Sequence, residues 1–338
     1  MHLVSGEYLN FQGDDIDVYD IIEKNVSFKI SNGQGKRKSE EVMGANTQSM
    51  IFTIYGDYLR HYGNKIWIGS LVRLLKEFGH NEQGVRVAVS RMVKQGWIQS
   101  EKQGNKSFYF LTERGVSRMD EAANRIFKLN PHEWDRKWRI LMYSIPEEKR
   151  QIRDELRQEL LWSGFGSFSN ACWISPNNLE KEVNLLIEKY DISEYVDFFV
   201  SDYKGPKDSQ SLVEKSWPLE EIENKYEEFI SKYSKQFIVH QSVLSKGEMS
   251  DSECFVERTN LVHEYRKFLF IDPGLPKELL PPMWSGNHAA LLFSQYYQLL
   301  AEPASRFFEN VFEADNDLRR KDHSYDAKNH PLIIHSKK

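Results

Sequence analysis

The sequence has 338 residues, of which 40% are hydrophobic and 13% aromatic, and its formal net charge is -5. This length favours two or three folded domains. No apolar run is long enough to span a bilayer, which argues against an integral membrane protein. Cys172 and Cys254 lie far apart without the clustered ligands of a closed zinc site. We therefore expect a cytoplasmic protein without a metal or another cofactor.

Residues 1–48 show a weak, polar pattern. Residues 7–13 resemble a scrambled viral protease site, and residues 33–38 are glycine-rich and basic. We interpret residues 1–48 as a tag or a flexible N-terminal segment.

Residues 49–112 carry three apolar stripes at helical spacing, followed by two strand-like runs. Gly79 and Asn81 separate the second helix from the third, and Gly96 ends the third. The stripes consist of Ile51, Ile54, Tyr55 and Tyr58; Leu71, Leu74, Leu75 and Phe78; and Val85, Ala88, Val89, Met92 and Val93. Residues 97–100 and 108–111 flank a polar turn and predict a hairpin. Three helices and a hairpin predict a winged helix-turn-helix.

The polar face of the third helix is the strongest functional signal, because such a helix can enter the major groove of DNA. We expect arginines there to read guanine and the lysines to contact phosphates. The same pattern also fits a solvated helix face, and winged helices also serve as protein-interaction scaffolds. The predicted DNA-binding residues are Gln83, Arg86, Ser90, Arg91, Lys94, Lys102 and Lys106.

The rest of the chain predicts a linking helix and two further domains. Residues 113–133 fit a linking helix with an apolar stripe. Residues 134–212 alternate strands and helices in the order βαβαβ, which suggests a ferredoxin-like middle domain. Residues 213–313 are mainly helical, with expected helices at 219–233, 254–268, 288–300 and 304–312, and residues 314–338 form a polar tail. The predicted fold class is α+β.

Five separated segments of the sequence resemble the PaaX family of phenylacetate-catabolism repressors. The resemblance covers residues 49 to about 331, through residues 49–58, Val85–Arg91, and Trp173-Ile174-Ser175-Pro176. It continues in residues 272–276 and 280–284. Within the element Trp134-Asp135-Arg136-Lys137-Trp138, Arg136 stands where this family often has glycine.

The resemblance implies a homodimeric, nucleoid-associated repressor that binds double-stranded operator DNA and is not an enzyme. It also implies an aryl-CoA thioester as effector, typically phenylacetyl-CoA, which relieves repression. Such a ligand needs cations for its phosphates and an apolar slot for its ring. The candidate effector residues are Arg258, His263, Arg266 and Trp284, although the histidine and the tryptophan also fit packed core positions.

A metal-dependent nuclease is the rival hypothesis, because the middle domain resembles that of CRISPR-adaptation endonucleases. That family typically has an aspartate at the end of the first strand, where it can ligate a metal. Ser144 stands at the matching place here. Without that oxygen ligand, metal-assisted phosphodiester cleavage loses its anchor.

Overall fold

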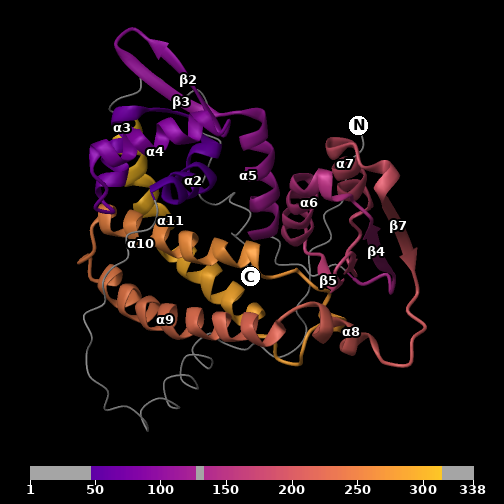
Figure 1. Ribbon diagram of the computed structural model, residues 1–338. Helices are drawn as coiled ribbons and strands as arrows, with labels where there is room; N and C mark the ends of the chain where they lie inside the picture. The colour runs from indigo at the N-terminus through magenta and orange to yellow at the C-terminus, as the bar shows by residue number, and fades with distance from the viewer. Residues whose placement is uncertain (1–46, 127–132, 314–338) are drawn as a thin grey trace, which may run out of the picture. The chain divides into compact units, whose positions relative to one another are not determined.

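The computed structural model describes residues 47–126 and 133–313 (Figure 1). Most of the expected N-terminal segment 1–48, the end of the expected linking helix and the polar tail 314–338 lie outside the described residues. Within them the protein combines helices with two small antiparallel sheets. The predicted α+β class is confirmed.

The winged helix is built from the predicted stripes. Its helices are α2 (Thr47–Asp57), α3 (Ile68–Lys76) and α4 (Glu82–Lys94), with the short η1 (Leu59–His61) after α2. The apolar core includes Ile51, Ile54, Leu71, Leu74 and Val85, all fully buried. Val93, expected in the third stripe, is instead 36% exposed, because the helical period places it at the edge of the buried stripe.

The wing is a hairpin of β2 (Ile98–Gln103) and β3 (Lys106–Leu111), which extends away from α3 and α4 in Figure 1. A third strand, β1 (Lys65–Trp67), pairs with β3 and gives the order β1-β3-β2. The sequence pattern did not indicate β1, because three residues are too few to show an alternation.

The middle domain follows helix α5 (Glu113–Ile126). Its elements are β4 (Trp138–Tyr143), η2 (Glu147–Lys149), α6 (Arg150–Trp162), β5 (Gly166–Ser169), β6 (Cys172–Ser175), α7 (Glu180–Tyr190), η3 (Ser193–Tyr195) and β7 (Val196–Ser201). The sheet has the order β5-β6-β4-β7. Leu141, Leu156, Trp173 and Val183 share one core, which places α6 and α7 on the same face of the sheet. The pattern βαββαβ is ferredoxin-like, and β5 is the strand that the expected βαβαβ order lacked.

The turn before β4 contains Arg136, the residue noted above as standing where glycine is common. Arg136 has a φ of 60°, in the left-handed region where glycine is favoured. The Asp135 carboxylate accepts a hydrogen bond from the Lys137 backbone at 2.9 Å and pairs with Arg139 at 2.7 Å. These contacts hold the turn in a conformation that costs a non-glycine residue energy.

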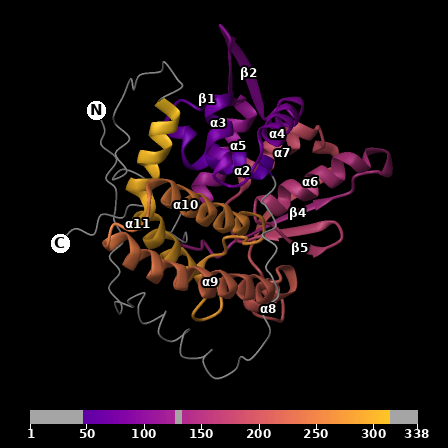
Figure 2. The same ribbon diagram turned by 90° about the vertical axis from the view of Figure 1, so that its left-hand side faces the viewer.

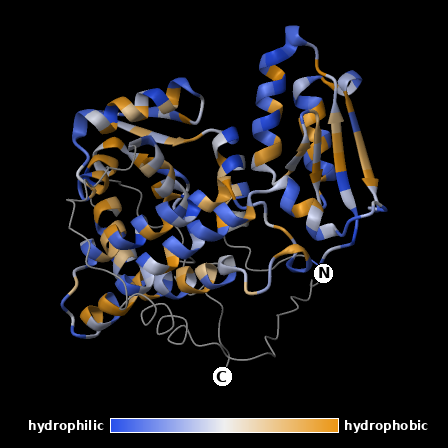
Figure 3. Ribbon diagram, turned by 60° about the horizontal axis from the view of Figure 1, so that its bottom comes forward, coloured by the Kyte–Doolittle hydropathy of each residue, from blue (hydrophilic) through white to orange (hydrophobic). Residues whose placement is uncertain are grey.

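The C-terminal region consists of α8 (Ser209–Ser216), α9 (Leu219–Ser245), α10 (Asp251–Tyr265), η4 (Arg266–Phe270), η5 (Lys277–Leu279) and α11 (Ser285–Glu313). Helices α9, α10 and α11 lie side by side (Figure 2). Apolar and polar stretches alternate along the helices (Figure 3). The two expected helices 288–300 and 304–312 are one helix, which continues through Pro303.

Candidate nucleic-acid interface

Helix α4 separates an apolar face from a polar one. The Asn81 side chain caps its start by accepting a hydrogen bond from the Gly84 backbone at 2.7 Å, and Gly96 follows its end with a φ of 71°. The buried face consists of Val85, Ala88, Val89 and Met92. All five predicted DNA-contacting residues of this helix are exposed: Gln83, Arg86, Ser90, Arg91 and Lys94. The structure therefore brings these five side chains together on one solvent-facing surface.

Arg86 is oriented by its own helix. Its Nε donates to Glu82 Oε1 at 2.8 Å, and its Nη2 lies 2.7 Å from the same oxygen. Both side chains are more than half exposed, so the ion pair contributes little to stability. Its effect is to restrict where the guanidinium points.

The wing carries the two other predicted lysines. Lys102 is exposed on β2, while Lys106 is half-buried on β3, with its Nζ 5.1 Å from the centre of the Trp67 ring. On the same sheet, Lys65 Nζ pairs with Glu101 at 2.7 Å. That contact lowers the pKa of the Glu101 carboxyl, chiefly through the hydrogen bond from Lys65.

Arg114 is a further cation near α4 that the sequence pattern did not single out. It is exposed in the first turn of α5, and its guanidinium lies 4.3 Å from the centre of the Trp97 ring. Trp97 packs edge-to-face on Phe52 of α2 at 5.6 Å. Two features of the sequence could have indicated Arg114. Trp97 directly follows Gly96 at the end of the third helix, and Arg114 follows soon after the capping Thr112.

The four predicted effector residues do not form one open pocket. Arg258 is 2% exposed, and its Nε and Nη2 donate to the two carboxylate oxygens of Asp57 on α2, at 3.0 and 2.9 Å. Its Nη1 donates to the Ala301 carbonyl and to Ser305, and Nη2 also donates to Tyr297. These contacts engage all five guanidinium N–H groups. In this arrangement Arg258 has no donor left for a ligand phosphate.

His263 and Arg266 also point toward α2. The Nδ1 atom of His263 lies 2.8 Å from Thr53 Oγ1, and Arg266 Nη2 donates to the Ser49 carbonyl at 3.0 Å and to its hydroxyl. Burial, reinforced by Arg266 and Lys267, lowers the pKa of His263 to about 4, and burial lowers the pKa of Arg266 to about 10.

Ser49, Thr53 and Asp57 recur every four residues on α2 and therefore share one face. They contact Arg266, His263 and Arg258 in turn. We call these six residues the α2 seam. It joins the first helix of the winged helix to α10 and η4, and sequence reasoning had named only its C-terminal half.

Trp284 lies apart from the α2 seam in an aromatic cluster. It is 5% exposed and packs edge-to-face on Tyr226 at 5.8 Å. Tyr226 in turn stacks on Phe268 of η4 at 3.9 Å. Trp284 therefore occupies a packed core position. A packed core position is the alternative to a role in effector binding that the sequence left open.

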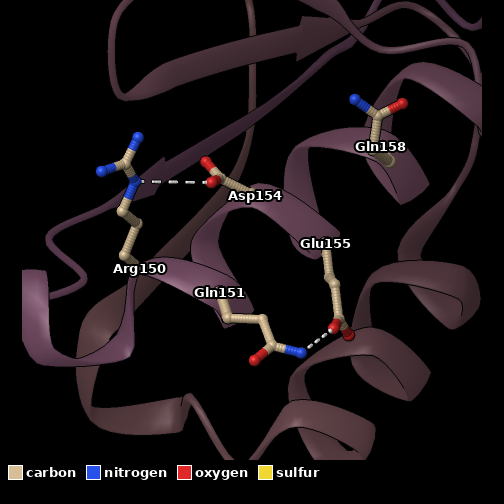
Figure 4. A pocket seen from close by; sticks show the side chains of 5 residues that line it. All are labelled: Arg150, Gln151, Asp154, Glu155 and Gln158. Carbon is tan, nitrogen blue, oxygen red and sulfur yellow. Dashed lines mark hydrogen bonds and ion pairs between the residues drawn. The ribbon is translucent and has the colours of Figure 1, made fainter.

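A surface hollow on α6 contains none of the predicted site residues (Figure 4). Arg150, Gln151, Asp154, Glu155 and Gln158 line it. Gln151 donates to Glu155 at 3.0 Å, and Arg150 lies 3.7 Å from Asp154. These are pairs four residues apart on one helix, which is typical of a solvated helix face.

Comparison with known proteins covers most of the chain. Residues 46–115 match the PaaX-like protein family, residues 131–213 the PaaX protein central Cas2-like domain, and residues 217–310 the PaaX-like protein C-terminal domain. The transcriptional repressor PaaX of Escherichia coli (strain K12) is 32% identical over 262 residues, which cover 77% of this chain and 82% of that protein. The chain belongs to the PaaX family. An uncharacterized protein of Mycobacterium tuberculosis matches 77% of this PaaX-family chain and 98% of its own, with 20% identity and a TM-score of 0.46.

Ser144, which stands where the nuclease hypothesis expects an aspartate, lies just after β4. The Ser144 backbone N–H donates to the Tyr195 carbonyl at 2.8 Å. Within residues 47–126 and 133–313, no group of three or more His, Cys, Asp or Glu residues is placed to hold a metal ion. In the same part of this PaaX-family chain, no helix has both the length and the apolar character needed to cross a membrane.

Proposed function

We propose that this chain is a transcriptional repressor, not an enzyme, and that it binds double-stranded operator DNA with α4 in the major groove. The observation that carries this proposal is the exposed polar face of α4 on a helix held by a winged-helix core. The relative from Escherichia coli, itself named a transcriptional repressor, supports it. An operator-bound regulator of this kind would be found in the cytoplasm with the nucleoid.

The residues on α4 and the wing divide into two roles. Arg86 and Arg91 read base edges, because a guanidinium can donate two hydrogen bonds to one guanine. Lys94, Lys102 and Lys106 contact phosphates, which position the protein without reading sequence. We propose that the protein acts as a homodimer, so that two copies of α4 meet half-sites about 34 Å apart on one face of the DNA.

We further propose that the genes controlled are those of phenylacetate catabolism and that phenylacetyl-CoA releases the repressor. The α2 seam supports a route for this signal, since α10 and η4 are hydrogen-bonded directly to the first helix of the DNA-binding domain. A thioester that binds the C-terminal region better in the DNA-incompetent state would lower operator affinity by the ratio of its two affinities.

The test is an anisotropy titration of labelled DNA from upstream of the protein's own gene, with and without phenylacetyl-CoA. We expect specific binding that the thioester weakens by roughly 5- to 150-fold and that free phenylacetate leaves unchanged, since the acid lacks the phosphates. Arg266→Ala should retain operator binding but respond weakly. Equal operator affinity with and without saturating thioester would refute the induction step while leaving the DNA-binding proposal intact.

A further inference from the structure

The polar face of α4 contains one large apolar side chain that is exposed and is not part of the buried core. Val87 is 45% exposed. It lies four residues after Gln83 and three before Ser90, in the middle of the predicted contact face. A β-branched residue at an exposed helix position has a lower helix propensity than the long polar residues around it. Its presence there therefore gains only partial burial and no helix stability.

Val87 sits in a shallow surface hollow together with the groups that can read bases. Glu82, Gln83, Arg86, Val87 and Ser90 line this hollow. The contact with Glu82 takes Arg86 Nε and one N–H of Nη2. The opposite edge of the planar guanidinium, formed by Nη1 and the second N–H of Nη2, is left to donate two parallel hydrogen bonds.

The major groove presents one apolar group to a protein, the 5-methyl group of thymine. A guanine presents two acceptors, O6 and N7, on the same groove wall. An arginine and a valine at consecutive positions of one helix match a guanine and a thymine on neighbouring base pairs. Hydrogen-bonding side chains surround the valine. Their bonds to the DNA would fix which base pair the valine contacts.

We propose that Val87 is a specificity-determining residue, which contacts a thymine methyl beside the guanine read by Arg86 as oriented by Glu82. This inference rests on the proposed function, because it requires α4 to lie in the major groove. Burial of one methyl group changes the affinity by about fourfold. Each half-site should therefore contain one thymine whose methyl group contributes to the affinity, independently of the base pair that the thymine forms.

The experiment replaces the thymines of the upstream DNA with deoxyuridine, one at a time, which removes the methyl group and keeps the base pair. We expect one replacement in each half-site to weaken binding of the parent protein by about fourfold. Val87→Ala should bind the thymine-containing DNA more weakly and lose the response to that replacement. Val87→Thr keeps a methyl group and should keep the response.

Val93→Ala is the matched control, because Val93 is a second exposed valine of α4 whose position falls on a different side of the helix. It should respond to deoxyuridine as the parent does. A parent protein indifferent to every replacement, or a Val87→Ala variant with the parent's full response, would overturn the inference while DNA binding stands. Failure of the parent to bind the upstream DNA at all would overturn the proposed function as well.

Discussion

Breaking the buried ion pair of the α2 seam should destabilise the whole protein. Arg258 and Asp57 are 2% and 0% exposed at their side chains, and the attachment spans 201 residues of sequence. Burial alone would lower the pKa of Arg258, but the attraction of Asp57 and of Tyr297 raises it above its usual value. The guanidinium therefore stays charged, and removing Asp57 would leave that charge buried without its counter-ion.

We expect Asp57→Asn and Arg258→Met each to lower the free energy of unfolding by about 3–5 kcal/mol. The double replacement Asp57→Leu with Arg258→Met should recover most of this loss, since no buried charge is left unpaired. Urea unfolding, followed by circular dichroism and tryptophan fluorescence, measures both. The control is Arg306→Ala, which removes an ion pair to Asp251 whose partners are 51% and 36% exposed. It should change stability by less than about 1 kcal/mol.

The result that would refute this reasoning is a single variant as stable as the control. That result would mean that water or a rearranged side chain stabilises the charge that the replacement leaves without its partner. Because the ion pair joins α2 to α10, we also expect the winged helix and α10 of the parent protein to unfold in one transition. Separate transitions for the two would contradict the seam as a structural connection.

Three other outcomes follow from the geometry. Lys102→Ala should weaken binding to all DNA similarly and reduce the dependence of log K on log salt by about one unit, measured by titrations between low and moderate salt; an unchanged slope would remove Lys102 from the phosphate contacts. His263 has its folded pKa near 4, below the unfolded value of about 6.5, so its contribution to stability is present above pH 6.5 and is lost as pH falls toward 4. Parent protein should therefore lose about 2 kcal/mol more than His263→Gln between pH 7.5 and 5, and equal losses in urea unfolding would contradict the buried neutral imidazole. Supercoiled DNA should stay intact with magnesium or manganese; nicking that disappears on replacing a carboxylate near Ser144 would support the nuclease instead.

The winged helix could be predicted because its signals are local. Each stripe repeats every three or four residues within one helix, and glycine and asparagine mark the ends. β1 and β5 could not, since each has only three or four residues. β1 pairs with the distant β3, and β5 begins with a glycine and pairs with β6 in an irregular register. The predicted break between residues 300 and 304 was wrong, because packing of α11 against α9 and α10 outweighs the hydrogen bond that Pro303 removes.

The polar face of α4 could be predicted from neighbouring residues, whereas the α2 seam depends on contacts between residues that lie far apart in the sequence. The exposure of Arg91 and Lys94 follows from the helical period of their own segment. By contrast, the partners of Arg258 lie 201, 39 and 43–47 residues away, so a single sequence shows a cation but not that its donors are already engaged. Val87 was overlooked because a lone valine beside an apolar stripe resembles part of the core.

The most direct test of the central claim compares the affinities of the protein for its own upstream DNA and for a scrambled duplex of equal composition. We expect the parent to prefer the upstream DNA by 10³-fold or more at physiological salt, in the order-of-magnitude range of specific DNA-binding proteins. Arg86→Ala and Arg91→Ala should lower operator affinity by about 1–3 kcal/mol, with reduced discrimination in at least one of them. Equal affinity of the parent for both duplexes, or operator binding by both variants that matches the parent, would contradict a repressor that reads DNA through α4.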